Sequence, residues 1–517
     1  MSSGTASNSS GVTRPAVILA AFLVANVAIQ TLRLTWSLKP SAADHHHHLK
    51  GLLPSQSHRF PFATNSTLAS NAVLFTPENA SQGFSIPQLL ALCHAGRSLT
   101  LTREWAIEAP ENDNAARESL IRNFIHVCYP FEMMTSQGAR SMGFCSDYIQ
   151  YIYHANGRLV DEFGATEFHA KRVSCPNSTF IHGEYLTPAL YDDVSLSQID
   201  QARLSELTKL PLANLPQTVP AVRNMWLPNL EQTNKAHLSI LPLFHQILCK
   251  TRITCTAMQQ YVQKNQVYPT PKFEYMSHSS PDVLLDARHL FGDPFFTTLT
   301  NSTRSYNKFL HTHGRTGTKR TDQVVECWLT HADFPQLTIV GELSQWRSDL
   351  QEKAARAANI HLADFVDVST LRALQIEHGV AICSSTQEGY GHYINDARSM
   401  GSLLLVTDHP PMSEFVNGDG VDGILIQPSG KPFSSDYQAL SNEFKSIADV
   451  QMTDICAAVK RVLKMNENER KRIAMEGRKS YERDTAFMVE KMNELVEEAW
   501  QHLGRNQESL NQAQYVL

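Results

Sequence analysis

Short apolar runs alternate with amphipathic helical patterns through much of the chain, which predicts an α/β protein. The clearest example begins near Tyr306: an expected strand, KFLHTHG, then a polar loop, the helical pattern TDQVVECWLTHA with Thr321 as its expected N-cap, and the strand pattern QLTIVG. The helical pattern WRSDLQEKAARAAN and then VSTLRALQIEH follow. Repeated alternation of strands and helices at this spacing predicts a doubly wound parallel sheet.

The stretch from Gly379 to Pro428 carries the most informative pattern, which predicts strand, polar loop, helix, strand, loop and strand in turn. Two glycines in QEGYGH allow backbone N–H groups to approach a ligand closely. A helix is expected to begin at about Tyr393, with Asp396 in its first turn, and its free N–H groups and dipole favour an anion. The stretch therefore predicts a site for a phosphorylated ligand.

The first half of the chain, from about Phe84 to Asp293, mixes helical and strand patterns. Three short strands are expected in PAVRNMWLPN, HQILCKT and KFEYMSHSS. In an open α/β sheet, ligands bind beyond the carboxyl ends of the strands. This rule places six polar residues at a cleft, namely Asn229, Glu231, Lys250, Thr251, His278 and Ser279. The alternative role for each of them is in a turn or a helix cap.

Beyond Pro428 the pattern becomes helical, and three helices are expected at 453–464, 467–483 and 487–503. The apolar stripe of the third helix is typical of packing against the rest of the protein.

Residues 15–32, PAVILAAFLVANVAIQTL, contain no charged side chain. About 18 residues just suffice to cross the hydrocarbon layer of a membrane, for which ~17 is the lower limit. A signal anchor is favoured, and the alternative is a cleaved signal peptide, with Ala25 and Ala28 suited to cleavage. A lumenal or extracellular catalytic part is favoured by the Asn-x-Ser/Thr sequons that follow, at Asn65, Asn79, Asn177 and Asn301.

Composition limits the remaining possibilities. The 517 residues suggest roughly two to three domains, and a net charge of −6 gives no indication of nucleic acid as a partner. The nine cysteines include no Cys-x-x-Cys or zinc-like spacing, so no metal site is indicated. Cys383 is expected to be a buried thiol, whereas Cys128, Cys145 and Cys175 are candidates for disulfides in an oxidising compartment.

The register of the central stretch resembles the donor site of retaining, family-4-type GT-B glycosyltransferases, which carry a glycosyl transferases group 1 domain. The matching segments are EGYGHYIND, ARSMG and SLLLVTDHPPMSE, which run without a gap from Glu388 to Glu414, and then DGVDGILIQP. The resemblance is strong over about residues 307 to 430. It implies two doubly wound Rossmann-like domains that face each other across a cleft.

The expected organisation combines this resemblance with the N-terminal pattern. Residues 1–14 are a disordered cytoplasmic tail, 15–32 a transmembrane signal anchor and 33–83 a stem. Residues 84–300 form the acceptor-side domain, 301–480 the domain that binds the nucleotide-sugar, and 481–517 a helix that crosses back, followed by a tail.

The resemblance also implies roles for single residues. Glu388 is expected to contact the transferred sugar and Asp396 the ribose, where Asp replaces the family's usual Glu. HGRTGTKR resembles a segment of the family that reaches the diphosphate, which assigns Arg315 and Lys319 to that role, with Arg320 as an alternative to either.

His392 stands where the family usually has an aliphatic residue. A contact with donor or acceptor and a structural hydrogen bond are both open for it. Glu388 and His392 are the candidate catalytic residues, and the expected substrate-binding residues are Arg315, Lys319, Gly389, Tyr390, Gly391, Asp396 and Glu414.

The implied function is transfer of a sugar from a nucleotide-sugar donor to a hydroxyl group of a glycan, lipid or protein, with retained anomeric configuration. No cofactor or metal is expected, since the chain contains no Asp-x-Asp. The alternatives are a nucleotide-sugar epimerase and a catalytically silent lumenal sugar- or nucleotide-binding protein. The expected location is the Golgi or endoplasmic reticulum membrane, as a single-pass type II protein with a lumenal catalytic part, or outside the cell after cleavage.

Overall fold

A computed structural model of the chain describes residues 86, 125–129, 142–155, 158–161, 179–183, 223–233, 235–314, 317–342, 348–364, 366–430, 433–434 and 446–514. The expected tail, signal anchor and stem lie outside these residues. Across the described ranges, no helix is both long and apolar enough to span a membrane.

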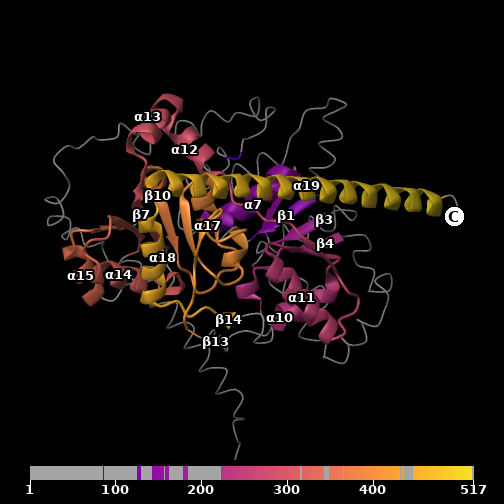
Figure 1. Cartoon of the computed structure of the whole chain (residues 1–517). Helices are drawn as coiled ribbons and strands as arrows, with labels where there is room; N and C mark the ends of the chain where they lie inside the picture. The colour runs from indigo at the N-terminus through magenta and orange to yellow at the C-terminus, as the bar shows by residue number, and fades with distance from the viewer. Residues whose placement is uncertain are drawn as a thin grey trace, which may run out of the picture. The chain divides into compact units, whose positions relative to one another are not determined.

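Two parallel sheets of six strands each organise the described residues (Figure 1). The first has the order β2-β1-β3-β4-β5-β6, with β1 Ile125–Tyr129, β2 Arg158–Asp161, β3 Thr179–His182, β4 Arg223–Trp226, β5 Gln246–Cys249 and β6 Lys272–Tyr275. The second has the order β12-β11-β10-β7-β8-β9, with β7 Ser305–Gly314, β8 Leu337–Gly341, β9 Ile360–Ala363, β10 His378–Cys383, β11 Leu403–Thr407 and β12 Ile424–Ile426. The predicted pair of parallel Rossmann-like sheets is confirmed.

Helices connect and cover the strands, as parallel pairing requires. Those of the first half are α7 Met142–Ala155, α10 Lys235–Ser239, α11 Arg252–Lys264, α12 Val283–Phe291 and α13 Asp293–Thr303. Those of the second half are α14 Thr321–Thr330, α15 Ser348–Arg356, α16 Val368–Glu377, α17 His392–Ser399, α18 Met452–Lys464 and α19 Glu467–Gln514. The remaining elements are the 3-10 turns Leu230–Gln232, Leu241–Leu243, Gly317–Lys319 and Met412–Phe415 and the antiparallel pair β13 Phe433–Ser434 and β14 Ser446–Ile447.

Each sheet has its own apolar core. All six residues of the central strand β10 are buried, as expected for a parallel strand covered on both faces. Phe309, Trp328 and Val380 are fully buried in the core of the second half. Trp226 and Ile247 are fully buried in the core of the first half.

Two disulfides lie among the described residues, Cys249–Cys255 and Cys327–Cys456. Neither pair was expected from the sequence. Cys383 is a buried free thiol, as predicted. The side chains of Cys128, Cys145 and Cys175 lie outside the described part of the chain, so their pairing stays a prediction.

The end of the chain forms one continuous helix, α19, where the pattern predicted two. The expected break near Asp484 does not occur, because polar residues there have partners in neighbouring elements. Arg398 Nη2 lies 2.6 Å from Asp484 Oδ2, and the Thr485 hydroxyl lies 2.6 Å from that of Ser279. Tertiary contacts thus stabilise a segment whose composition suggests a turn.

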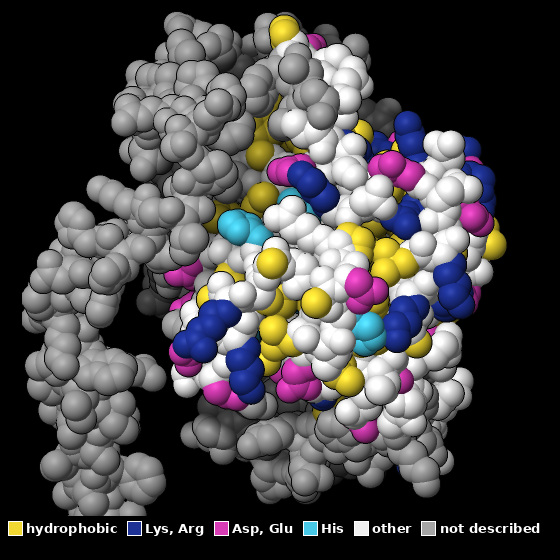
Figure 2. Space-filling model, turned by 60° about the vertical axis from the view of Figure 1, so that its left-hand side comes forward, with side chains coloured by type: hydrophobic (Ala, Val, Ile, Leu, Met, Phe, Trp, Pro, Cys, Tyr) yellow, Lys and Arg dark blue, Asp and Glu magenta, His cyan; other side chains and the backbone are white. Residues whose placement is uncertain are grey.

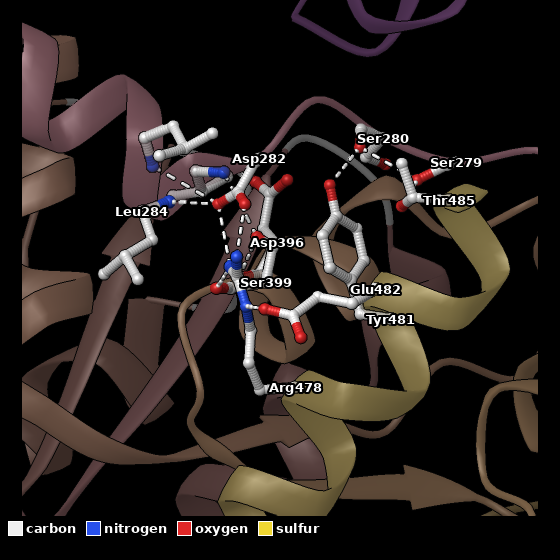
Figure 3. Close-up of polar contacts among 12 residues, drawn as sticks. Ser279, Ser280, Asp282, Leu284, Asp396, Ser399, Arg478, Tyr481, Glu482 and Thr485 are labelled. Carbon is white, nitrogen blue, oxygen red and sulfur yellow. Dashed lines mark hydrogen bonds and ion pairs between the residues drawn. The ribbon is translucent and has the colours of Figure 1, made fainter. Parts of the chain in front are cut away.

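Helix α19 contacts both halves of the chain (Figure 1). Glu498 forms ion pairs with Arg223 on β4 and Lys272 on β6. Further along, Arg478 binds the Asp282 carboxylate with both terminal nitrogens, and the Tyr481 hydroxyl donates to the carbonyl of Ser280 at 2.7 Å (Figure 3). The helix therefore holds the segment that follows β6 against the second sheet.

The start of α14 differs by one residue from the prediction. Arg320, with φ 53°, occupies the N-cap position, and Thr321 is the first helical residue. The Thr321 hydroxyl instead lies 2.8 Å from His311 Nε2 and 2.7 Å from His313 Nδ1. It joins strand β7 to the helix.

Candidate active site

The strand order of the second sheet indicates where a ligand binds. Sequential connections run outward in one direction from β7 through β8 to β9 and in the other from β10 through β11 to β12. In such sheets ligands bind at the point where the order reverses, beyond the carboxyl ends of the strands. The two loops at this point follow β7 and β10, and they contain Lys319 and Glu388. The loops are joined by a backbone hydrogen bond of 2.8 Å from Thr386 N to Thr318 O.

Lys319 and Glu388 form an ion pair across these loops, and both side chains are largely buried. Glu388 Oε1 also accepts a hydrogen bond of 2.5 Å from the Ser385 hydroxyl. The Lys319 ammonium lies 3.5 Å from the centre of the Tyr393 ring, close enough for a cation–π contact. A cation and a carboxylate are thus held next to each other where the topology places a ligand.

Helix α17 begins directly after the Glu388 loop. Gly391 is its N-cap residue, with φ 102°, a backbone conformation that favours glycine. The helix starts at His392, one residue before the prediction, so Asp396 lies in the second turn and not in the first. The dipole therefore stabilises its carboxylate less than expected.

Asp396 is mostly buried, with Arg372 of α16 as its nearest cation, 3.8 Å from Nη1 to Oδ2. Burial raises the pKa of Asp396, and Arg372 and His392 oppose that shift. Arg372 itself forms a buried pair with Asp286 at 2.7 Å, through its Nε. The ribose contact expected of Asp396 stays a prediction.

His392 is held at both ring nitrogens by residues of the first half. Its Nδ1 lies 2.8 Å from the Ser280 hydroxyl, and its Nε2 lies 3.0 Å from Oδ1 of Asp147 on α7. Asp147 also binds Lys250 Nζ and His278 Nε2, each at 2.6 Å. The structural hydrogen bond that the sequence left open for His392 is therefore present, and it joins the two halves.

The charges of this cluster favour a structure without a metal. Asp147, His278 and His392 place three donor atoms within 4.8 Å of one another, a set that suits a transition metal. Burial opposes ionisation of Asp147, but Lys250, His392 and His278 together hold its pKa well below the usual range. Burial lowers the pKa of His278 to about 4. Because Lys250 already balances the Asp147 charge, a divalent cation would add uncompensated positive charge in a buried site. We assign no metal here.

Glu414 makes a second polar contact between the halves. Its carboxylate oxygens accept hydrogen bonds from the backbone N–H groups of Arg252 and Ile253 at 2.7 and 2.8 Å. These are the first two residues of α11, whose N–H groups have no partner within the helix. Both oxygens of Glu414 therefore bind protein backbone in this arrangement, and its expected contact with substrate stays a prediction.

Residues 311–443 match the family model described as glycosyl transferases group 1. This part of the chain is a glycosyl transferases group 1 domain. The resemblance that the sequence showed over about residues 307–430 is thereby confirmed. No curated protein matches the chain.

Three solved structures illustrate the likeness of fold. A glycosyltransferase from Rickettsia africae is 13% identical, with 73% of this chain and 98% of that one covered and a TM-score of 0.46. Sucrose-phosphate synthase from Thermosynechococcus elongatus is 11% identical, with 73% and 98% covered and a TM-score of 0.47. The pneumococcal O-GlcNAc transferase GtfA, in complex with UDP and GlcNAc, is 16% identical, with 63% and 57% covered and a TM-score of 0.42.

Within the group 1 domain, two of the expected substrate-binding residues also contact the first half of the chain. The Tyr390 ring is buried, and its hydroxyl donates to the carbonyl of His278. A Cβ on Gly389 would lie 1.3 Å from Oδ1 of Asn229, so a glycine is needed there for close approach. Arg315 lies outside the described residues, and its role stays a prediction.

Two of the residues selected by the strand-end rule, Lys250 and His278, meet at Asp147 beside the group 1 domain, and their contact with a ligand stays a prediction. Asp147 and Arg372 were missed. Both lie on helices without a recognisable motif, and the only signal available was a charged residue at an otherwise buried helical position.

Replacing Glu414 with alanine is expected to lower the free energy of unfolding by about 1 kcal/mol, because the first two N–H groups of α11 lose their acceptor while the N-cap Thr251 remains. The same contact joins the halves, so we expect kcat/KM to fall by about fivefold. Thermal unfolding and donor-dependent turnover measure the two effects. Asp367→Ala is the matched control, since Asp367 caps α16 at 2.9 Å within one domain and its loss affects stability alone. Equal activity losses in both variants would contradict the role of Glu414.

Acidification is expected to destabilise the protein between pH 6.5 and 4. Burial lowers the pKa of His278 and His311 from 6.5 to about 4, and burial has the same effect on His154 and His245. In this window the unfolded chain binds more protons, so the stability present above pH 6.5 is lost as the pH falls toward 4. Thermal midpoints from pH 7.5 to 4.5 test this, with the exposed His289 replaced by glutamine as a control that keeps the slope. A flat profile would contradict it.

Proposed function

We propose that the protein is a retaining glycosyltransferase that moves a sugar from a nucleotide-sugar donor to a hydroxyl acceptor. The observation that carries this proposal is the Lys319–Glu388 pair at the reversal point of the sheet in the group 1 domain. A leaving nucleoside diphosphate develops negative charge, which Lys319 and the N-terminus of α17 neutralise. Glu388 then accepts hydrogen bonds from hydroxyls of the transferred sugar.

The pair rearranges when the donor binds. Without ligand, Lys319 and Glu388 balance each other's charge. The diphosphate draws Lys319 away, and the freed carboxylate turns to the sugar. Retention follows when the leaving phosphate accepts the proton of the acceptor hydroxyl on the same face of the sugar. His392, held by Asp147 and Ser280, keeps the halves closed and excludes water that would hydrolyse the donor.

We place the catalytic part in the lumen of the secretory pathway, anchored by residues 15–32. Two disulfides among the described residues support an oxidising compartment. The sequon residue Asn301 is exposed at the end of α13 and therefore available for glycosylation. Treating the expressed protein with an N-glycosidase tests this placement, because an unchanged electrophoretic mobility would contradict it.

The donor is tested with the full chain in detergent. Thermal midpoints are measured with UDP, GDP, UDP-glucose, UDP-N-acetylglucosamine and GDP-mannose, and donor hydrolysis is followed. We expect at least one nucleotide-sugar to stabilise the protein more than its nucleotide and to be turned over slowly. An altered sugar on an intact nucleotide would indicate an epimerase, and stabilisation without turnover a binding protein.

A nucleic-acid partner is not proposed. On the face shown in Figure 2, basic and acidic side chains are interspersed and form no single-sign patch. Phosphate backbones are bound by clustered positive charge.

A further inference from the structure

Asn229 presents a bare acceptor atom to the loop that contains Glu388. The residue follows β4, and only 7% of it is exposed. Its Nδ2 donates to Glu231 Oε1 at 3.2 Å. Because a carboxylate only accepts, this bond fixes the orientation of the amide, and Oδ1 is the atom that lies against Gly389. Among the described residues, no donor reaches Oδ1.

His278 presents a second buried acceptor atom without a donor. Its Nε2 lies 2.6 Å from the Asp147 carboxylate, which requires the ring proton on that nitrogen. A neutral ring then leaves Nδ1 as an acceptor, and no donor among the described residues reaches it. The ring packs edge-on against Tyr390, 4.5 Å between centroids. Both bare acceptors thus lie at strand ends of the first sheet, next to the segment that begins with Glu388.

Buried acceptors are nearly always hydrogen-bonded, and an unpaired one is costly. Two unpaired acceptors beside one loop indicate a ligand that supplies hydrogen-bond donors. Hydroxyl groups are the donors that a sugar offers, and Gly389, which touches Asn229, directly follows the residue assigned to the transferred sugar. A site built to bind hydroxyls also rejects analogues that lack them.

We propose that Asn229 Oδ1 and His278 Nδ1 accept hydrogen bonds from hydroxyl groups of the transferred sugar and thereby help to select the donor. This inference rests on the proposed function and deepens it. The sugar enters between the Glu388 loop and the ends of β4 and β6. The nucleotide is bound by the group 1 domain alone.

The test compares binding of nucleotides with binding of their sugar conjugates. Asn229→Leu removes the acceptor at similar size, His278→Phe keeps the ring, and Asn359→Leu changes an asparagine that bonds the His331 carbonyl away from the cleft. For the full chain, dissociation constants are measured by calorimetry for UDP, GDP, UDP-glucose, UDP-N-acetylglucosamine and GDP-mannose. We expect each cleft variant to weaken the preferred nucleotide-sugar by about tenfold and to leave its nucleoside diphosphate unchanged.

A donor analogue with one sugar hydroxyl removed adds a second readout. It should bind the wild type more weakly, whereas the variant that has lost the matching acceptor should not distinguish it from the parent donor.

The outcomes separate this inference from the proposed function. If the wild type binds none of the five compounds, the proposed function fails, and the inference with it. If the wild type prefers a nucleotide-sugar and the cleft variants keep that preference, the inference alone is overturned. If the variants bind the nucleotide and the nucleotide-sugar equally more weakly, the inference is also overturned, because the two residues would then only shape the cleft.

Discussion

Glu388→Gln is expected to reduce kcat/KM by about a hundredfold while nucleoside diphosphates bind at least as tightly as before. The carboxylate is replaced by an amide of the same shape, so the sugar loses a charged acceptor. Lys319 loses its ion-pair partner, and no carboxylate then competes with the diphosphate for it. Turnover of the preferred donor and calorimetry with UDP or GDP measure the two effects, which should have opposite signs.

Glu377→Gln is the matched control for this experiment. Glu377 also pairs with a lysine, Lys308, in the same domain but at the amino ends of β7 and β10, opposite the loops that carry Lys319 and Glu388. It should leave both turnover and diphosphate affinity unchanged. Activity of Glu388→Gln near that of the wild type would remove Glu388 from the site. A large loss of diphosphate affinity would instead mean that Glu388 only orients Lys319.

Lys319→Met is expected to weaken nucleoside diphosphate binding by about 10- to 100-fold, the usual value of a charge-assisted hydrogen bond. Methionine keeps most of the chain length without the charge, so the loss reports the ammonium group, including its cation–π contact with Tyr393. We expect kcat to fall as well, because the charge that develops on the leaving phosphate is no longer neutralised. Calorimetry with UDP and GDP and steady-state kinetics measure these effects.

Lys308→Met serves as the control, since it removes a lysine from the ion pair away from the site. The double variant Lys319→Met with Glu388→Gln should lose less activity than the sum of the single losses, because the two side chains form one unit. Full additivity would show that they act independently. Unchanged diphosphate affinity in Lys319→Met would assign the phosphate to another cation, such as Arg315 or Arg320.

Much of the donor side could be predicted from the sequence because its signals are local. The spacing from Glu388 to Asp396 and the glycines of the loop lie within a few residues of each other. The alternation of strands and helices is also local, and the parallel sheet that it predicted is present in the second half of the chain. The helix boundaries at His392 and Arg320 were wrong by one residue, because cap geometry depends on the backbone conformation of a single residue.

The sequence by itself therefore determined the fold class, the group 1 domain and the loop that carries Glu388. Tertiary structure decided which distant residues meet. Asp147 binds His278 at a separation of 131 residues, and Glu414 caps a helix 162 residues away. Such contacts depend on how elements distant in the sequence pack together, which no local pattern contains. The continuous helix α19 also depends on tertiary contacts. Its polar middle is stabilised by Arg398 and Ser279, which lie on other elements and come near it only in the folded protein.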